Sequence, residues 1–315
     1  MKRHHKTRIR ASKAHGILLL DKPRGPSSRH VLDELDAKLR LGGLGHAGTL
    51  DPLASGLLIV LLGRARRLQD VFMGAPKTYV GTVQFGETSA TLDGEGPITK
   101  GAGPVPGPLE DALARVIPQF TGRIMQAPPS HSALRIAGRR AYDLARAGDL
   151  EDLPERPVTI HSIEVQSCTA DSAVLEIRCG SGTYIRSLAR DLGEALQCGA
   201  WLSELRRTAT GAFAVADAIT VSEATADKVL SIGEALSSFG RVDVTEEEAS
   251  ELRRGRMRAL EPSSTISPLE PLFAWANGVP VCRVKRAPSG LYHSCLLLSG
   301  KPSGEAEEPT GIDPQ

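Results

Sequence analysis

The stretch GHAGTLDPLASG, Gly45 to Gly56, places a single aspartate, Asp51, directly before a proline in a glycine-rich segment. Glycine lets the backbone approach a ligand closely, and Pro52 stiffens the turn that presents the carboxylate. An Asp-Pro pair by itself is most often only a turn. The segment could cradle a phosphate, cap a turn or bring the backbone close to a substrate, so the surrounding sequence has to distinguish these possibilities.

A nucleotide site is the first alternative. Three glycines within residues 43–48 match G-x-G-x-x-G, and Asp70 follows where a ribose-binding carboxylate would stand. Such a fingerprint must follow a strand and open a helix, because the helix N-terminus binds the pyrophosphate. Here a predicted helix precedes the glycines, Pro52 interrupts the required helix, and Thr49 replaces the lysine of a P-loop. We therefore expect no nucleotide cofactor, which argues against a nucleotide-dependent oxidoreductase.

Composition describes an ordinary globular protein of 315 residues with a net charge of +1. The five cysteines include no C-x-x-C pair, so neither a disulfide framework nor a metal site is indicated, and a cytoplasmic setting is expected. The longest apolar run, residues 56–63, is far shorter than the roughly 20 residues that span a bilayer. We expect no membrane association.

Charge is unevenly distributed along the chain. Basic residues are concentrated in segments 1–13, 63–67, 132–146, 205–207 and 253–258. The C-terminal tail is acidic and has the composition of a disordered segment. A basic body is weak evidence for a nucleic-acid partner, and solvated helix faces would give the same clusters.

Hydrophobic periodicity predicts a mixture of strands and helices without strict alternation. Strands are expected at 16–23, 56–63, 77–86, 156–168 and 172–180, and helices at 27–40, 64–73, 109–120 and 182–196. This pattern favours an α+β fold with a largely antiparallel sheet. Composition changes near Ser238, after which a separate small unit is expected to end in two short strands, 279–286 and 291–298.

Six motifs in a fixed order carry a family resemblance. They read DKPRGPSS, GHAGTLDPLASGLL, KTYVGTVQFG, PPSHSALRIAGRRAYDLAR, GTYIRSLARDLG and LRRTATG. Together they closely resemble the TruB family of tRNA pseudouridine synthases over roughly residues 16–221. The resemblance implies a pseudouridine synthase fold, with a mixed, largely antiparallel central sheet flanked by helices and loops, and a small C-terminal β-rich, PUA-like RNA-binding domain.

The resemblance also implies a division of the chain. A flexible basic arm occupies residues 1–13, and the catalytic domain 14–238 contains an RNA-clasping insertion at about 124–153. The PUA-like domain spans 239–300, and a disordered acidic tail spans 301–315.

The activity implied by the resemblance is conversion of uridine 55, in the T-loop of tRNA, to pseudouridine. The bond between N1 and C1′ breaks, the base rotates, and a bond between C5 and C1′ forms, without a cofactor or metal. The expected partner is the T-arm of tRNA, with the chain acting as a monomer. The alternative is a tRNA-folding factor that opens the T-loop through the same groove.

By the same resemblance, Asp51 is the catalytic residue and Arg186 its partner, while Tyr79 stacks on the target base and takes part in proton removal at C5. One carboxylate is enough in principle. A glycoside hydrolase needs two because it protonates a leaving group and activates a water, whereas an isomerase that keeps its uracil needs neither. A guanidinium within hydrogen-bonding reach would keep the carboxylate ionised. The simpler interpretation of Tyr79 is packing.

Four further residues are expected at the substrate. His46 matches a residue that enters the gap left by extruded nucleotides, and extrusion is needed because the target base is inaccessible in a folded loop. Tyr184 and Leu205 match positions that line the uracil pocket, although core packing would also explain Leu205. Lys22 matches a motif that supports the floor of the site, and either a structural role or a phosphate contact fits it.

The RNA-clasping insertion departs from the family pattern at two positions. His131 stands where tyrosine is usual, and Arg135 stands where lysine is usual. Arg135 keeps the positive charge expected to contact RNA but changes its geometry.

Overall fold

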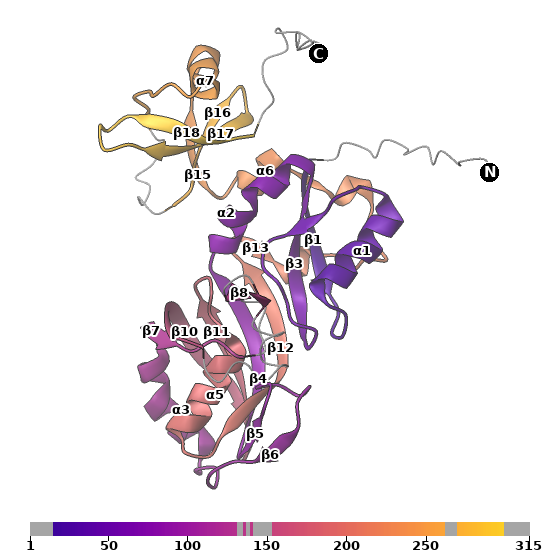
Figure 1. Ribbon diagram of the computed structural model, residues 1–315, viewed down its shortest axis with the longest axis vertical. Helices are drawn as coiled ribbons and strands as arrows, with labels where there is room; N and C mark the ends of the chain where they lie inside the picture. Colours follow the sequence, from indigo (N-terminus) through magenta and orange to yellow (C-terminus); the bar gives the residue numbers. More distant parts are fainter. Residues whose placement is uncertain (1–14, 131–134, 137–138, 141–152, 262–269, 299–315) are drawn as a thin grey trace, which may run out of the picture. The chain divides into compact units, whose positions relative to one another are not determined.

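The computed structural model describes residues 15–130, 135–136, 139–140, 153–261 and 270–298. The chain divides into two units, which are coloured along the sequence in Figure 1. The first contains Leu18–Leu61 and Gln69–Lys228, and the second contains Ala14–Ile17, Leu62–Leu68 and Val229–Gln315. The domain limits expected from the sequence stay a prediction, and the basic arm and acidic tail lie outside the described residues.

The first unit is built around one large sheet. Its strands are β1 (Gly16–Lys22), β2 (Gly45–His46), β3 (Ala54–Leu62), β4 (Lys77–Phe85), β7 (Gly122–Gln126), β10 (Arg156–Cys168), β11 (Ser172–Cys179), β12 (Ala200–Thr210) and β13 (Phe213–Ala214). Two small hairpins accompany it, β5 (Glu87–Ser89) with β6 (Ile98–Lys100) and β8 (Arg135–Ile136) with β9 (Arg139–Arg140).

Helices and short 3-10 turns connect these strands. They are α1 (Ser28–Leu39), η1 (Gly63–Leu68), α2 (Gln69–Gly74), α3 (Leu109–Val116), η2 (Ile117–Phe120), α5 (Ile185–Ala195), η3 (Val215–Asp217) and η4 (Ala226–Lys228). The predicted helix 64–73 is therefore a 3-10 turn followed by a short α-helix.

The sheet order is β1-β3-β12-β4-β11-β10-β7. Strand β12 runs parallel to β3, with Leu205 opposite Ala54, and antiparallel to β4, with Leu205 opposite Gly81. The pairs β4–β11, β11–β10 and β10–β7 are antiparallel. The predicted α+β fold with a mixed, largely antiparallel sheet is confirmed.

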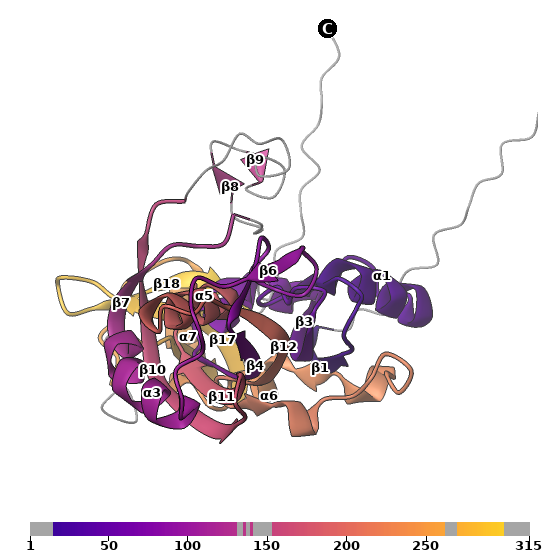
Figure 2. The ribbon, with the colours of Figure 1, turned by 90° about the horizontal axis from the view of Figure 1, so that it is seen from below.

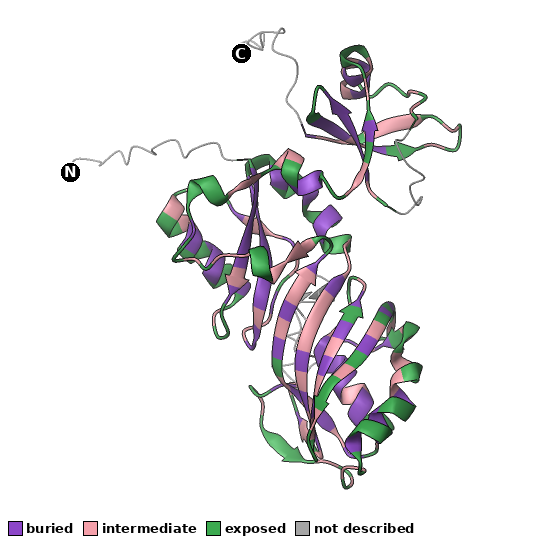
Figure 3. Cartoon of the chain, turned by 180° about the vertical axis from the view of Figure 1, so that it is seen from behind, coloured by how far each residue is buried: buried purple, intermediate pink, exposed green. Residues whose placement is uncertain are grey.

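Burial differs along the sheet in a way that the sequence explains. Strand β3 is buried almost throughout, as its unbroken apolar run predicts, whereas β4, β11 and β12 alternate because one face is more exposed (Figure 3). Helix α1 lies beside β1 and β3, and α5 packs on β12 and β4 (Figure 2).

Strand β12 corrects one expectation. Residues 205–207 belong to no predicted element. Their basic cluster predicts either a nucleic-acid contact or a solvated helix face, and both interpretations require exposed side chains. Arg207 is instead 1% exposed, with Nε donating to the carbonyl of Leu57 at 2.7 Å and Nη2 donating to that of Gly48 at 3.0 Å. Arg207 points to the buried face of β12, so its guanidinium has almost no contact with solvent. The two carbonyl oxygens provide the hydrogen bonds that water would otherwise provide.

The second unit has its own sheet, in the order β15-β16-β17-β18. These strands are β15 (Gly240–Asp243), β16 (Leu272–Ala276), β17 (Val279–Arg286) and β18 (Tyr292–Leu297). The two strands expected there are present, and two more precede them. Helix α7 (Glu246–Arg253) packs on β16, β17 and β18. Strand β14 (Leu230–Ser231) pairs with Gly16 and Ile17, the two residues of β1 that belong to this second unit, and leads into α6 (Ile232–Leu236). Among the described helices, none has both the length and the apolar character of a membrane span.

Gly56 offers a test of the β3–β12 junction. It has φ +101°, and a Cβ there would lie 2.3 Å from the carbonyl oxygen of Arg207. Gly56→Ala should therefore lower the free energy of unfolding by more than about 2 kcal/mol. Gly74→Ala is the control, because a Cβ at Gly74 meets nothing within 4 Å. Urea unfolding followed by circular dichroism measures both, and equal midpoints for the two variants would contradict the described junction.

Candidate active site

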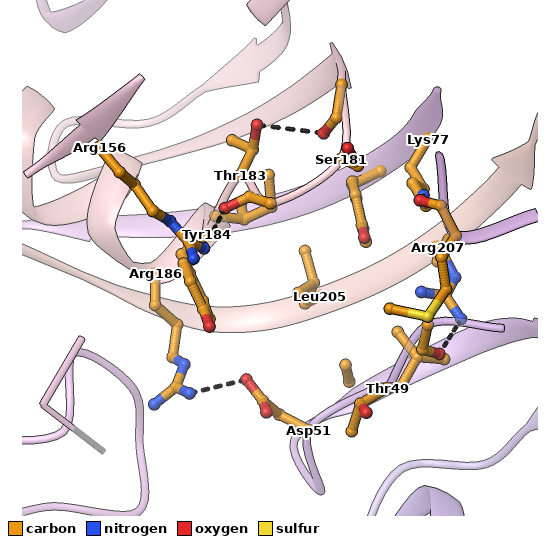
Figure 4. Close-up of a pocket in the computed structure, with 18 residues that line it drawn as sticks. Thr49, Asp51, Lys77, Arg156, Ser181, Thr183, Tyr184, Arg186, Leu205 and Arg207 are labelled. Carbon is orange, nitrogen blue, oxygen red and sulfur yellow. Dashed lines mark hydrogen bonds and ion pairs between the residues drawn. The ribbon is translucent and has the colours of Figure 1, made fainter. Parts of the chain in front are cut away.

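A cavity of about 410 Å³ opens in the first unit at the end of the loop before β3 (Figure 4). Five residues singled out from the sequence line it, namely Asp51, Tyr79, Tyr184, Arg186 and Leu205. They come from the 45–56 loop, β4, the start of α5 and β12. The fold thus brings together residues that are far apart in the chain.

The loop that carries Asp51 is held by main-chain contacts. The buried Ser28 hydroxyl, at the start of α1, donates to the carbonyl of Leu50 and accepts from its amide, both at 2.9 Å. The amide of Ala54 donates to the carbonyl of Asp51 at 3.0 Å, closing the turn that Pro52 stiffens. The backbone of Asp51 is therefore fixed from both sides while its side chain remains 38% exposed.

Arg186 bridges two carboxylates. Its Nη2 lies 2.8 Å from Oδ2 of Asp51, and its Nη1 lies 3.1 Å from Oδ2 of Asp93 and donates to the carbonyl of Thr91 at 3.0 Å. The side chain of Arg186 is 6% exposed and that of Asp93 is 3% exposed. A buried guanidinium with fixed partners points in a set direction, and its Nη2 meets Asp51 in the cavity (Figure 4).

Asp93 is in turn held by its own loop. Its Oδ1 accepts from the Thr91 hydroxyl at 2.5 Å and from the amide of Glu95 at 3.0 Å. Sequence patterns did not single out Asp93, since a D-G pair in a glycine-rich segment is typical of an exposed turn. The sequence contains no other signal of this buried carboxylate.

The middle and far side of the cavity are formed by the sheet. Leu205 of β12 lies between Tyr184 on one side and Arg207 with Lys77 on the other (Figure 4). Tyr79 is opposite Arg207 in the register of β4 and β12. Burial raises the pKa of the Tyr79 phenol, and the positive charge of the Arg207 guanidinium opposes that shift.

Lys77 is another lining residue that the sequence did not reveal. Its ammonium donates to the carbonyl of Met73 and, at 2.6 Å, to that of Ala75. Burial lowers the pKa of Lys77 to about 8, and the charge of Arg207 adds to the effect. Lys77 and Arg207 both line the cavity, and their positive charges favour an anionic group of a ligand.

Tyr184 is held at the N-terminus of α5 by two side chains outside the predicted set. The Gln126 amide accepts from the amide of Tyr184 at 2.9 Å and donates to its carbonyl at 3.2 Å. The Arg156 guanidinium lies over the Tyr184 ring, 4.9 Å from its centroid.

Two predicted residues, Lys22 and His46, do not line the cavity. Lys22 is fully buried, and its ammonium donates to the carbonyls of Pro23 at 2.9 Å and Pro26 at 2.8 Å, as expected of a structural role. Burial lowers the pKa of Lys22 to about 8, although the charge of Asp51 raises it. His46 is half-buried in β2, and burial lowers its pKa. Arg135 lies in β8, opposite Arg140, and His131 lies outside the described residues.

The charge pattern limits the chemistry of the cavity. Asp51 is the one carboxylate among its described lining residues, and four cations line the same cavity, namely Lys77, Arg156, Arg186 and Arg207. Within the described part of the chain, no three His, Cys, Asp or Glu side chains gather as a metal site. The arrangement offers a single carboxylate beside an apolar and aromatic surface, in a cavity suited to an anionic substrate.

The two carboxylates that pair with Arg186, those of Asp51 and Asp93, should contribute differently to the free energy of unfolding. Asp93→Asn should cost about 3 kcal/mol in free energy of unfolding, because it breaks a buried ion pair. Asp51→Asn should change that free energy by less than about 1 kcal/mol, because Asp51 is half-exposed to solvent. Urea unfolding of both variants against the parent chain measures the difference. A larger loss for Asp51→Asn than for Asp93→Asn would contradict this assignment.

Comparisons with known proteins identify the family and the fold of the chain. The family model described as TruB family pseudouridylate synthase (N terminal domain) matches residues 37–185, and that described as tRNA pseudouridylate synthase B C-terminal domain matches residues 186–239. The tRNA pseudouridine synthase B of Agrobacterium fabrum is 39% identical over 279 residues, covering 84% of this chain and 88% of that protein. That of Corynebacterium aurimucosum is 40% identical over 254 residues, covering 78% and 84%.

Solved structures show the same fold. A Cbf5-Nop10-Gar1 complex contains a chain with a TM-score of 0.70 and 24% identity, covering 91% of this chain and 86% of that chain. An H/ACA RNP bound to a substrate RNA containing 2'-deoxyuridine gives a TM-score of 0.69 at the same identity and coverage. With both family models matched in sequence and relatives near 40% identity over most of its length, the chain belongs to the TruB family of pseudouridylate synthases.

Proposed function

We propose that this chain converts uridine 55 in the T-loop of tRNA to pseudouridine, with Asp51, Arg186 and Tyr79 as its catalytic residues. Membership of the TruB family makes it a pseudouridine synthase, and the matched relatives are named as enzymes of tRNA. We further propose that it acts as a cytoplasmic monomer on the T-arm. The contact that carries the proposal is the 2.8 Å pair between Arg186 and the half-exposed Asp51.

The proposed reaction matches the single carboxylate of the cavity. Isomerisation breaks the bond between N1 and C1′ and forms one between C5 and C1′, so that C5 loses a proton and N1 gains one. No group leaves and no water enters, so the second carboxylate of a hydrolase is unnecessary. The reaction then needs a carboxylate at an electron-poor carbon, and Asp51, held by Arg186 at 2.8 Å, supplies one.

The aromatic and apolar lining fits a flipped base. Tyr79, Tyr184 and Leu205 line the same cavity as Asp51, and the faces of both rings can stack on uracil. Extrusion of a nucleotide costs a few kcal/mol, and stacking offsets it. Tyr79 also carries a phenol that can exchange a proton at C5. For His46 we propose a contact with the opened T-loop, for Arg135 a contact with the RNA backbone, and for Lys22 support of the floor of the site.

The test uses an unmodified tRNA transcript and maps pseudouridine after incubation with the purified chain. The parent chain should modify the T-loop uridine. Asp51→Asn should abolish turnover, a loss of more than about 1000-fold, because the neutral amide cannot act at carbon. Its affinity for tRNA should stay within about two-fold, since phosphate contacts dominate binding.

The control is Asp33→Asn, which removes an exposed carboxylate on α1 paired with Arg29. It should leave turnover unchanged. Failure of the folded parent chain to modify the T-loop would refute the proposal. If Asp51→Asn keeps full activity in refolding misfolded tRNA, the folding-factor alternative gains support as a second function.

A further inference from the structure

Tyr184 lines the cavity and is held in place by side chains from other elements. It precedes α5, two residues before Arg186, and its side chain makes no capping hydrogen bond to the helix. Two other side chains hold it, one at its main chain and one at its ring. Neither Gln126 nor Arg156 contributes to the proposed chemistry.

The main-chain contact comes from Gln126, which is 1% exposed. Its amide oxygen accepts from the amide of Tyr184 at 2.9 Å, and its amide nitrogen donates to the carbonyl of Tyr184 at 3.2 Å. A side-chain amide that bonds both polar groups of one residue fixes the backbone on either side of it. The φ and ψ of Tyr184, −103° and 115°, are thereby held as the chain enters α5.

The ring contact comes from Arg156. Its guanidinium carbon lies 4.9 Å from the centroid of the Tyr184 ring, within the range of a cation–π contact. Its Nη2 donates to the carbonyl of Gly182 at 2.6 Å. The guanidinium is therefore anchored to the loop just before Tyr184 while it covers the ring (Figure 4).

The two contacts share one origin in the sheet. Arg156 is the first residue of β10, Gln126 is the last residue of β7, and the two are directly opposite in the antiparallel register. A single cross-strand pair thus holds both the backbone and the ring of Tyr184. Since strand partners move together, the pair acts as one rigid support.

We propose that Gln126 and Arg156 are positioning residues that hold the Tyr184 ring where the target uracil stacks, so that the base meets the Asp51 carboxylate in a productive orientation. The inference rests on the proposed function, in which uracil enters this cavity. Arg156 acts through the ring, because its guanidinium is already engaged by Gly182 and Tyr184. Losing it should therefore slow turnover more than it weakens tRNA binding.

The first test is Arg156→Met, which keeps an unbranched side chain and removes the cation and its donors. The turnover number should fall roughly ten-fold, the size of one partly buried cation–π contact. The dissociation constant for tRNA should stay within about two-fold. Arg123→Met is the matched control, because Arg123 is exposed on β7, the strand that pairs with β10. It should leave both quantities unchanged, and Arg156→Lys should recover part of the turnover because it restores the cation alone.

A double-mutant cycle with Tyr184→Leu shows whether Arg156 acts through the ring. In the Tyr184→Leu background, Arg156→Met should cause no further loss of turnover. Independent, additive losses would overturn the inference. Weaker tRNA binding with an altered salt dependence would also overturn it, because that result would make Arg156 a phosphate contact.

A measurement without RNA separates this inference from the proposed function. The chain has four tyrosines, so fluorine NMR of the full chain containing 3-fluorotyrosine gives few signals, and Tyr184→Phe identifies the one from Tyr184. Arg156→Met and Gln126→Met should each shift that signal and leave those of Tyr79 and Tyr292 in place. An unchanged Tyr184 signal would refute the positioning role even in an active enzyme. If the parent chain has no activity but Arg156→Met and Gln126→Met shift the Tyr184 signal, the positioning role is supported and the proposed function is refuted.

Discussion

The site depends on one buried cation. The buried guanidinium of Arg186 needs partners, because removing a guanidinium from water carries a large cost unless charges and hydrogen bonds replace the solvent. Asp93 and the carbonyl of Thr91 supply that replacement on one edge, and Asp51 supplies it on the other. The need to satisfy this cation brings the loop after β5, the start of α5 and the 45–56 loop to the same place.

A second buried cation, Arg207, holds β12, β3 and the loop before β3 together in the sheet. It donates to the carbonyls of Gly48, in the loop before β3, and of Leu57, in β3, and it lies opposite Tyr79 in the register of β12 and β4. The apolar run of β3 supplies the buried surroundings in which these hydrogen bonds are strong. The geometry of the cavity is therefore set by polar contacts inside an apolar sheet. Arg186 connects two loops to the start of α5, and Arg207 connects β12 to the loop before β3 in addition to the backbone pairing of β12 with β3.

The features that could be predicted from the sequence are those that depend on hydrophobic periodicity and on motifs. The apolar run of β3, the alternation of β4 and the motifs around Asp51 and Arg186 predicted the α+β fold and the family. Sequence reasoning missed strand β12, and it missed Asp93, Gln126 and Arg207 for one shared reason. Charged and amide side chains are usually exposed, so the sequence pattern assigns them to the surface. Their burial is decided by partners from distant segments, such as the carbonyl of Leu57 for Arg207, and no local pattern contains that information.

The contrast between Asp51 and its surroundings explains how one half-exposed carboxylate can have a defined role. A carboxylate open to solvent would ordinarily sample several rotamers and be screened by water. Here its backbone is fixed through the Ser28 hydroxyl at Leu50, and its Oδ2 is fixed by a guanidinium that cannot turn without leaving Asp93. Dipoles and charges fixed before a substrate arrives need no reorganisation during the reaction. The Asp51 side chain is therefore accessible to a ligand, while the buried residues Ser28, Arg186 and Asp93 keep it in one position.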